Sequence, residues 1–366
     1  MEPYIPEELP LDLSKINWQK VAVNISKASA ALAYYNGILN SIPNPAIFLS
    51  PLETKEAVLS SRIEGTITTV DEVLKYEVDL KPDSIHKQED IIEVLNYRKA
   101  TRAAKDWLRR DLPFNLTMIC AIQNELIDGA RGKDKHPGEI RKEQVWIGPK
   151  GCSMDEASYI PPEPLGLRNH LDNLVNFMNR TDQEVLVQTA IMHAQFEIIH
   201  PFCDGNGRTG RILIPLFLWC KDLISAPMFY ISEYFDENRD LYIDNLRRIT
   251  FDNDWERWIL FFLDAIAIQA KRNNEKASQV LNLYKEMRNR IVDLTKSPYA
   301  MKVLDSLFTT PIMKTSDFIK DSGLEPKSAH RIIAKLKSDN ILVTIQKHSG
   351  RSAEILVFDQ LYHIIR

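Results

Sequence analysis

The chain has 366 residues, of which 44% are hydrophobic and 26% charged, and its formal net charge is −4. This balance excludes a disordered chain, and no apolar stretch is long enough to span a bilayer, so no membrane contact is expected. The N-terminal segment lacks the pattern of a signal peptide, and the four cysteines have no CxxC spacing, so we expect a cytoplasmic protein without a zinc site or a disulfide framework.

Residues 1–110 predict a helical N-terminal region. Apolar residues recur at helical spacing from Trp18 to Tyr35, where Asn36-Gly37 is expected to end the helix, and again in a long helix over 90–109. Between them a short helix is expected from Pro51 to about Ser61. We predict that it is terminated by the Glu64-Gly65 pair.

Residues 111–290 predict a mainly helical core that contains one β-hairpin. The segment 143–148 is rich in β-branched and aromatic residues and reads as a strand, with Tyr159-Ile-Pro-Pro162 as its return strand. Thr181-Asp-Gln-Glu184 has the form of a capping box and is expected to start the next helix. Helices are expected again over 237–248 and 255–290, and the first large domain is expected to end there.

The most informative stretch of the sequence is His200 to Arg211, HPFCDGNGRTGR. Pro201 disfavours helical geometry at His200, and helical spacing resumes after Gly207, so the stretch is predicted to be a short loop between two helices. Its glycines would free backbone N–H groups at the positive end of the second helix, which suits a phosphate group. The two arginines can grip phosphate oxygens, Asp204 can hold Mg²⁺, and His200 is placed to act as a general base.

Residues 297–366 differ from the rest of the chain, because they carry 10 Lys and Arg against 7 Asp and Glu. Three predicted helices are followed by two strands, joined by the basic turn 347–352, which is the order of a winged helix-turn-helix domain. The last helix, 326–338, would be the recognition helix if this domain binds DNA. Its charged residues are equally typical of a solvated face, and winged helices also serve in dimerisation and protein docking.

The stretch from His200 to Arg211 resembles the HxFx(D/E)GNGRxxR signature of the Fic family, whose members transfer AMP from ATP to hydroxyl side chains of target proteins. It matches that signature without a departure. The likeness covers roughly residues 5–290 and implies a mainly α fold, a Fic-type helical bundle with a β-hairpin flap. A small winged-helix domain at the C-terminus is often found in bacterial members.

The resemblance also implies roles for individual residues. His200 would deprotonate the target hydroxyl, and Asp204 would bind Mg²⁺ between the α- and β-phosphates of ATP. Arg208 would hold the β-phosphate region and Arg211 the γ-phosphate. Nucleotide contacts are further expected at Gly205, Asn206, Gly207, Thr209 and Gly210 in the loop, at Tyr242 as a wall for the adenine, and at Val145, Trp146, Ile147 and Gly148 in the flap. For Tyr242, simple helix packing explains the sequence equally well.

A second motif points to regulation. Ser60, Glu64 and Gly65 match the (S/T)xxxE(G/N) motif of the family's inhibitory helix, expected at about 51–65. A Glu64 carboxylate paired with Arg211 would remove the guanidinium that grips the γ-phosphate and would repel that phosphate. The resemblance therefore implies an enzyme that is autoinhibited.

Several alternatives remain open from the sequence. Fic-like folds can transfer other groups or remove AMP from a modified target, and a non-enzymatic, nucleotide-sensing regulator that binds DNA is a different class of function. Protein targets are expected but not identified, and a homodimer is the common state for such a protein. His193 is expected to be a packing residue rather than a second base.

Overall fold

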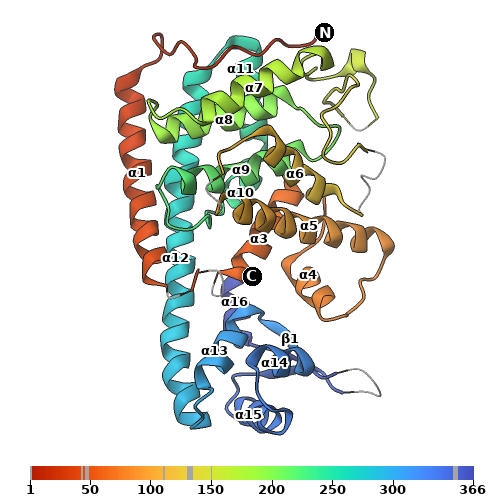
Figure 1. The fold of residues 1–366 in the computed structure, drawn as a ribbon, viewed down its shortest axis with the longest axis vertical. Helices are drawn as coiled ribbons and strands as arrows, with labels where there is room; N and C mark the ends of the chain where they lie inside the picture. The colour runs from red at the N-terminus through yellow and green to blue at the C-terminus, as the bar shows by residue number, and fades with distance from the viewer. Residues whose placement is uncertain are drawn as a thin grey trace.

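The computed structural model describes residues 2–42, 44–45, 49–109, 112–129, 135–149, 151–348 and 353–366. Within these residues the chain is mainly helical and carries one small sheet of three strands, so the predicted fold class is confirmed (Figure 1). The part before the central loop contains α1 (Trp18–Ser41), α3 (Ser50–Ile63), α4 (Val70–Glu77), α5 (Ile85–Leu108), α6 (Leu116–Ile127), the short 3-10 helices η2 (Met154–Glu156) and η3 (Pro164–Gly166), α7 (Leu167–Met178) and α8 (Val185–Ile199).

The central loop connects α8 to α9 (Asn206–Cys220), and these two helices form the middle of the core. Almost every residue of both helices is buried. They pack against each other, and α5, α6, α7, α11 and α12 surround them. The elements that follow α9 are α10 (Ser232–Glu237), α11 (Arg239–Asp252), α12 (Trp255–Thr295), α13 (Ala300–Thr309), β1 (Ile312–Lys314), α14 (Thr315–Ser322), α15 (Pro326–Ser338), β2 (Val343–Gln346), β3 (Ile355–Val357) and α16 (Asp359–Ile365).

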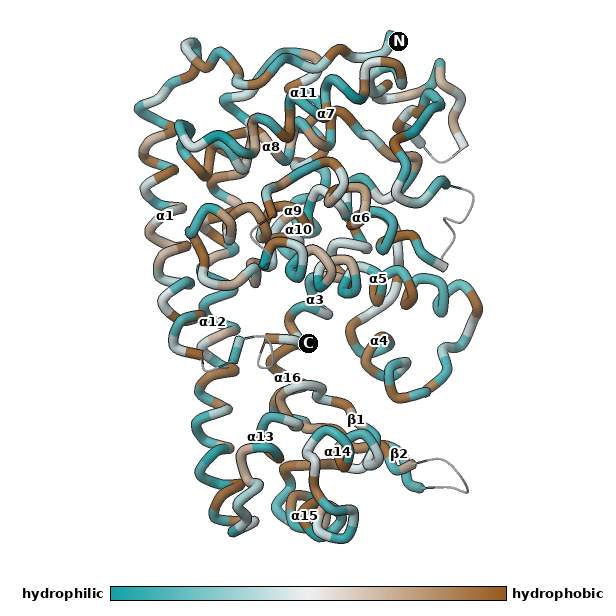
Figure 2. Tube along the Cα trace, in the orientation of Figure 1, coloured by the Kyte–Doolittle hydropathy of each residue, from teal (hydrophilic) through white to brown (hydrophobic). Residues whose placement is uncertain are grey.

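The longest helix, α12, runs along most of the molecule with α1 beside it (Figure 1). Its colouring alternates between hydrophobic and hydrophilic, as expected for a helix with one buried face (Figure 2). The prediction that α1 stops at Asn36-Gly37 is wrong, because the helix continues to Ser41. Tyr35 and Leu39 are both buried, so packing outweighs the helix-breaking tendency of glycine.

Two local predictions in the middle of the chain are also wrong. Helix α8 is capped by Glu184, whose carboxylate accepts a hydrogen bond from the Val187 N–H at 2.7 Å, and not by Thr181. Asp182 forms an ion pair with Arg180 instead, at 2.5 Å, and the chain there stays in bends. The cap is therefore made three residues later than the capping-box pattern suggests.

The predicted hairpin is reduced to a single antiparallel bridge between Ile147 and Tyr159. Pro161 and Pro162 follow two and three residues after Tyr159. Because proline has no N–H group, the ladder of hydrogen bonds cannot continue past the bridge. The side chain of Gln144 bonds the Pro161 carbonyl at 2.9 Å in place of a backbone donor, so the segment is a pinned loop rather than a pair of strands.

The C-terminal region, residues 297–366, contains the three helices and two strands that were expected. It also contains two elements that the sequence did not indicate, β1 and α16, and the sheet has the antiparallel order β1-β3-β2. Of the basic turn at 347–352, residues 349–352 lie outside the described residues. Helix α12 continues past residue 290 into this region, so one helix joins the predicted core to the C-terminal elements.

Helix α16 brings the end of the chain back toward α3 and α4 (Figure 1). The Tyr362 hydroxyl donates a hydrogen bond to Asp71 on α4, and Lys314 pairs with Asp79 just after α4. The C-terminal region therefore touches the part of the chain that carries Glu64. Nowhere along the described chain is there a helix with the length and apolar character needed to cross a membrane.

Candidate active site

His200 sits at the C-terminal end of α8 in a left-handed conformation, with φ 47°. Its Nδ1 atom lies 3.3 Å from the Glu197 carbonyl oxygen and can donate a proton to it, which leaves Nε2 free to accept one. Burial is the main cause that lowers the pKa of His200 to about 4. The imidazole is therefore neutral at physiological pH, as a general base must be.

Arg141, which the sequence analysis missed, holds this turn in place. Its side chain is buried and donates hydrogen bonds to the carbonyl oxygens of His200 at 2.9 Å and Pro162 at 2.6 Å. Its backbone N–H bonds the Pro201 carbonyl at 2.9 Å. One arginine thus ties the His200 turn to the end of the flap.

The loop between α8 and α9 is closed by its own side chains. The amide of Asn206 accepts from the Phe202 N–H at 2.9 Å and donates to the Phe202 carbonyl at 2.8 Å, while the Phe202 ring is fully buried below. Gly205 adopts φ 80°, a conformation that glycine takes without strain. The loop therefore presents the first turn of α9, whose N–H groups have no acceptor within the helix.

Arg211 is 1% exposed, and its guanidinium donates three hydrogen bonds to Ser60 and Glu64 at the C-terminal end of α3. Its Nε donates to the Ser60 hydroxyl at 2.8 Å, and one Nη atom donates to the Ser60 carbonyl at 2.9 Å and to Glu64 Oε1 at 2.5 Å. The pairing predicted between Glu64 and Arg211 is thus present. Ser60 contributes both its side chain and its backbone to the same guanidinium.

The Glu64 carboxylate lies against the first turn of α9. A Cβ atom built on Gly207 would come within 2.1 Å of Glu64 Oε1, so only glycine leaves room for the carboxylate there. Burial tends to raise the pKa of Glu64, but the charge and the hydrogen bond of Arg211 outweigh it and hold this pKa below its usual value. Glu64 is therefore an anion seated at a helix N-terminus, the place expected for a phosphate.

Gly65 explains why α3 ends where it does. It adopts φ 102°, and its N–H bonds the Arg62 carbonyl at 2.9 Å, which closes the C-terminal end of the helix. Glu64 is the C-cap residue of α3 and projects toward Arg211 from there. The glycine of the predicted motif thus sets the position of its glutamate.

Asp204 and Arg208 form a second charged group beside the loop. Arg208 bonds Asp204 Oδ1 at 3.3 Å and Glu93 at 3.1 Å, and the Asp204 side chain is 43% exposed. No group of three potential metal-ligating side chains occurs among the residues that the structure describes. One exposed carboxylate suits Mg²⁺, since this ion keeps several waters and takes further oxygens from a bound nucleotide.

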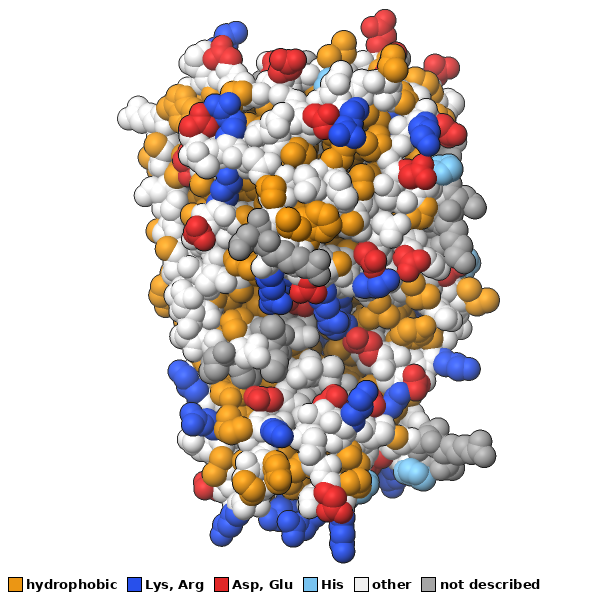
Figure 3. All heavy atoms as spheres, in the orientation of Figure 1, with side chains coloured by type: hydrophobic (Ala, Val, Ile, Leu, Met, Phe, Trp, Pro, Cys, Tyr) orange, Lys and Arg blue, Asp and Glu red, His pale blue; other side chains and the backbone are white. Residues whose placement is uncertain are grey.

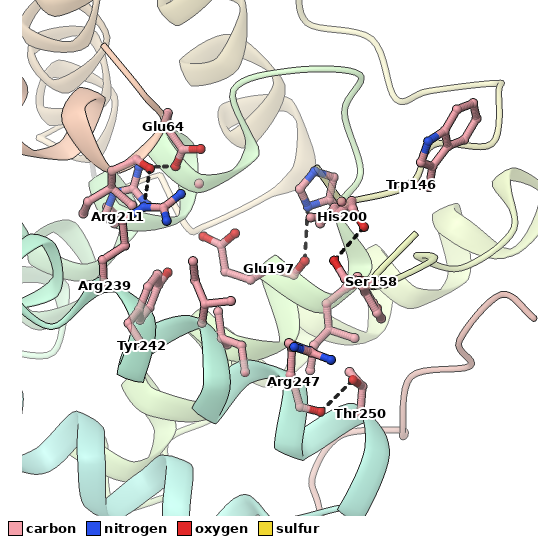
Figure 4. A pocket seen from close by; sticks show the side chains of 18 residues that line it. Glu64, Trp146, Ser158, Glu197, His200, Arg211, Arg239, Tyr242, Arg247 and Thr250 are labelled. Atoms are coloured by element: carbon pink, nitrogen blue, oxygen red, sulfur yellow. Dashed lines mark hydrogen bonds and ion pairs between the residues drawn. The ribbon is translucent and has the colours of Figure 1, made fainter. Parts of the chain in front are cut away.

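Part of this site borders a cavity of about 420 Å³, shown in Figure 4. His200, Arg211 and Gly207 line it from the loop, and Trp146, Ile147 and Gly148 line it from the flap. The same cavity is bordered by Glu64 and by one face of α11, whereas Asp204 and Arg208 do not line it. It is large enough to hold part of a nucleotide next to His200.

The surroundings of Tyr242 are compatible with both of its interpretations, a wall for the adenine and a helix-packing residue. It lines the cavity, yet it is 3% exposed, its hydroxyl lies 2.9 Å from His193 Nε2, and its ring stacks on Phe235 at 4.5 Å between centroids. His193 is fully buried, and burial is the main cause that lowers its pKa to about 3. His193 is thus a packing residue, as expected.

Other candidates lie further from the cavity or were not foreseen. Thr209 and Gly210 are buried behind the loop, and Val145 does not line the cavity. Besides Arg141, the sequence analysis missed Glu197 and Arg239, which both line the cavity. Glu197 stands one helical turn before His200, and that spacing is the one signal that could have found it.

Two family models match the chain. The model described as Fic/DOC family N-terminal matches residues 23–106, and the model described as Fic/DOC family matches residues 113–218. Together they span just over half of the chain and include both the α3 motif and the central loop.

Named relatives and a solved structure agree with these models. The chain is 24% identical over 329 residues to a probable protein adenylyltransferase of Aquifex aeolicus, covering 87% of this chain and 86% of that protein. It is 26% identical over 140 residues to a uridine 5'-monophosphate transferase of Xanthomonas campestris, covering 36% of this chain and 26% of that protein. A Fic family protein from Desulfovibrio desulfuricans has a similar fold, with a TM-score of 0.60, 18% identity and 98% coverage of both chains.

Proposed function

The chain belongs to the Fic/DOC family, and we propose that it transfers AMP from ATP to a Ser, Thr or Tyr hydroxyl of target proteins and of itself. The observation that carries this proposal is the joint placement of His200 and Arg211 on one cavity, beside the N-terminus of α9. A base and an anion site next to each other are what a phosphoryl-type transfer requires.

In the proposed reaction the target hydroxyl donates its proton to Nε2 of His200. Its oxygen then forms a bond to the α-phosphorus of ATP as the bond from that phosphorus to the bridging oxygen breaks, and pyrophosphate leaves. The Nδ1–H bond to the Glu197 carbonyl keeps the imidazole in the tautomer that can accept this proton. Transfer thus produces an AMP ester on the target.

The nucleotide would be held by the loop and the arginines. The free N–H groups at the start of α9 face the phosphates, Arg208 lies toward the β-phosphate region, and Arg211 takes the γ-phosphate. Asp204 would hold Mg²⁺, which neutralises phosphate charge when it is bound. Tyr242 would border the adenine from α11.

The flap would hold the target. Ile147 uses its backbone for the bridge to Tyr159, while Trp146 and Gly148 make no backbone–backbone hydrogen bond within the described part of the chain. Alternate residues of an extended segment face opposite sides, so these two are free to pair with a target strand. Recognition through backbone would fix the hydroxyl near His200.

Glu64 would keep the enzyme in an inactive resting state. Its carboxylate occupies the anion position beside Gly207 and engages Arg211, so a γ-phosphate meets a negative charge where it needs a positive one. ATP could then bind only with its phosphates displaced. Withdrawal of Glu64 would restore the site.

Mass spectrometry of the purified Glu64→Gly variant incubated with ATP and Mg²⁺ tests this function. We expect an AMP adduct on the variant itself. A parallel incubation with UTP addresses the second candidate, UMP transfer, which the Xanthomonas relative suggests. A UMP adduct in place of an AMP adduct would replace the proposed substrate, and loss of AMP from a modified target would indicate the reverse reaction.

A DNA-binding regulator is the non-enzymatic candidate. Lys and Arg side chains gather at the end of the molecule where α15 lies (Figure 3). Two lysines of the predicted recognition helix are engaged within the protein, however, since Lys335 bonds the Leu294 carbonyl at 2.9 Å and Lys337 pairs with Glu354 at 2.6 Å. Tight, salt-sensitive DNA binding without any nucleotide adduct would favour this candidate.

A further inference from the structure

We propose that Glu197 is a second carboxyl partner of Arg211. When Glu64 is withdrawn, Glu197 pairs with the Arg211 guanidinium and competes with the nucleotide phosphate for it. This inference rests on the proposed function, because it concerns the same site. If Glu197 competes in this way, withdrawal of Glu64 alone activates the enzyme in part. Glu197 is thus a positioning residue for Arg211.

The first step of the argument is the set of partners that Arg211 has. Arg211 donates hydrogen bonds to Ser60 and Glu64, and within the described part of the chain its ion pair is with Glu64. When Glu64 leaves, a guanidinium that is 1% exposed loses its counter-charge. A buried charge without a partner is costly, so a nearby carboxylate that is not already engaged gains by approaching it. Glu56 also feels the charge of Arg211, but it accepts hydrogen bonds from Ser232.

Glu197 is such a carboxylate, because its charge and that of Arg211 act on each other. It extends from α8, which packs on α9, and Figure 4 shows its carboxyl group in the cavity between Arg211 and His200. Its side chain is 11% exposed, and Oε1 is buried without a hydrogen-bond partner among the described residues. A buried carboxyl with an unused acceptor is rare in a core and is more typical of a functional site.

The residue at position 210 makes the space for this carboxyl. A Cβ atom on Gly210 would lie 2.4 Å from Glu197 Oε1, so a side chain there would push the carboxyl out of its place. Gly210 is helical and needs no special backbone conformation. The glycine is therefore explained by the position of Glu197 and not by the backbone.

Of the groups that face Glu197 in the described part of the chain, Arg211 is the cation that can pair with it. His193 Nδ1 is 4.0 Å away, but that ring is neutral because burial keeps its pKa at about 3. From α11, Tyr242 is uncharged, Arg239 gives its Nε to the Ile63 carbonyl at 3.0 Å, and Arg247 lies over the ring of Phe251. His200 is neutral as well, and Glu64 is negative.

The charge state of Glu197 depends on Glu64. Burial raises the pKa of Glu197 to about 8, Arg211 acts to lower it, and the negative charge of Glu64 raises it further. With Glu64 in place, Glu197 is protonated at neutral pH and leaves Arg211 to Glu64. Removal of Glu64 lowers the pKa of Glu197, so that its carboxylate forms and pairs with Arg211.

The test compares two variants, Glu64→Gly and Glu64→Gly/Glu197→Gln, in AMP transfer between about pH 6 and about pH 9. For Glu64→Gly, KM for ATP should rise as Glu197 ionises. The rise should reach up to about tenfold per pH unit above the pKa of Glu197, with a smaller change in kcat. Because glutamine cannot ionise, the second should lose this rise. The control is Glu184→Gln in the Glu64→Gly background. It makes the same chemical change at the exposed end of α8 and should leave the pH profile of KM unchanged.

ATP affinity measured by calorimetry on the same variants separates this inference from the proposed function. The inference would be overturned if the Glu64→Gly and Glu64→Gly/Glu197→Gln variants both transfer AMP and have the same pH profiles of KM and of ATP affinity. Absence of transfer in every Glu64→Gly variant, with no ATP binding, would instead overturn the proposed function. A folded Glu64→Gly/Gly210→Ala variant with unchanged ATP affinity would also count against a role for Glu197 at this place.

Discussion

His200 is prepared for proton transfer by its immediate neighbours and not by a charged partner. Its Nδ1 faces a backbone carbonyl, and burial keeps the ring neutral. This arrangement differs from a base whose ring nitrogen is oriented by a carboxylate. The charges of Glu64 and Asp204 favour the protonated ring, and bound nucleotide phosphates would favour it further.

The His200→Ala change should therefore separate binding from chemistry. In the Glu64→Gly background we expect transfer to fall by about 10²- to 10⁴-fold, the usual contribution of a general base. ATP affinity should stay within a few-fold, since no phosphate contact is lost. Radiolabel transfer and calorimetry measure the two quantities, and retained transfer would rule out the role of His200 as the base.

The pH dependence offers a second check at the same residue. Burial lowers the pKa of His200 to about 4, so its neutral form persists down to that pH and is lost only below it. With Glu197 changed to glutamine and Glu64 to glycine, kcat should stay level from about pH 8 to about pH 5 and fall only in more acid solution. A midpoint near the ordinary value for histidine, about 6.5, would contradict this account.

The sequence predicts the residues of the central loop because they are consecutive, and a turn between two helices brings them together without further information. The Glu64 contact with Arg211 came from the family resemblance, since 147 positions separate the two residues. Glu197 and Arg141 were missed. The place of Glu197 depends on the missing side chain at Gly210, and the function of Arg141 depends on carbonyls of distant segments. The spacing of Glu197 one helical turn before His200 is the local signal that was overlooked, and Arg141 has none.

Three polar side chains on one face of α3 help to attach this helix to the core. Glu56, Ser60 and Glu64 are four residues apart and therefore lie on one face of the helix. The carboxylate of Glu56 accepts hydrogen bonds from the hydroxyl of Ser232 at 2.6 Å and from its N–H at 3.1 Å. The inhibitory motif thus extends one further turn toward the start of α3.

Ser60→Ala should weaken this attachment. It removes the Arg211 Nε bond to the hydroxyl but leaves Glu64 in place, so basal transfer should rise by about tenfold, in line with about 1.5 kcal/mol for a hydrogen bond to a charged group. The neighbouring Ser61 provides a matched control, because its buried hydroxyl has no hydrogen-bond partner among the residues that the structure describes. A Ser61→Ala variant should leave the rate of label transfer unchanged, and an equal rise in both variants would refute the assignment.

Prediction at the level of elements succeeds for the long amphipathic helices and fails at their ends. Periodicity finds α5, α8 and α12, but the length of α1 and the cap of α8 depend on packing and on an ion pair. The flap was expected as a hairpin from its composition. The two prolines that follow Tyr159 limit it to one bridge, and that consequence could have been read from the sequence.

At the scale of the whole molecule, α12 joins the active-site core to the C-terminal region. Its far end packs on α13, where Phe308 is fully buried between Tyr284 and Phe358, with ring centroids 5.4 and 5.5 Å away. The same region contacts α4 through Tyr362 and Lys314. Because of these contacts, we expect the whole chain to unfold as one unit.

Phe308→Ala should therefore lower the stability of the whole chain. The lost aromatic packing and the cavity left behind predict a decrease of about 3–5 kcal/mol in the free energy of unfolding. Tyr299, which is 46% exposed, is the control, and its change to alanine should have an effect within about 0.5 kcal/mol. Thermal unfolding should show one transition at lower temperature, and two separate transitions would show that the C-terminal region unfolds on its own.

The central claim is that the contact between Glu64 and Arg211 holds an assembled AMP-transfer site inactive. The most direct measurement is the rate of self-modification by ATP labelled at the α-phosphate, compared between the unaltered protein and the Glu64→Gly variant. A coupling of about 1–3 kcal/mol predicts that the variant is about 5- to 150-fold faster. Equal rates in the two proteins would contradict the claim.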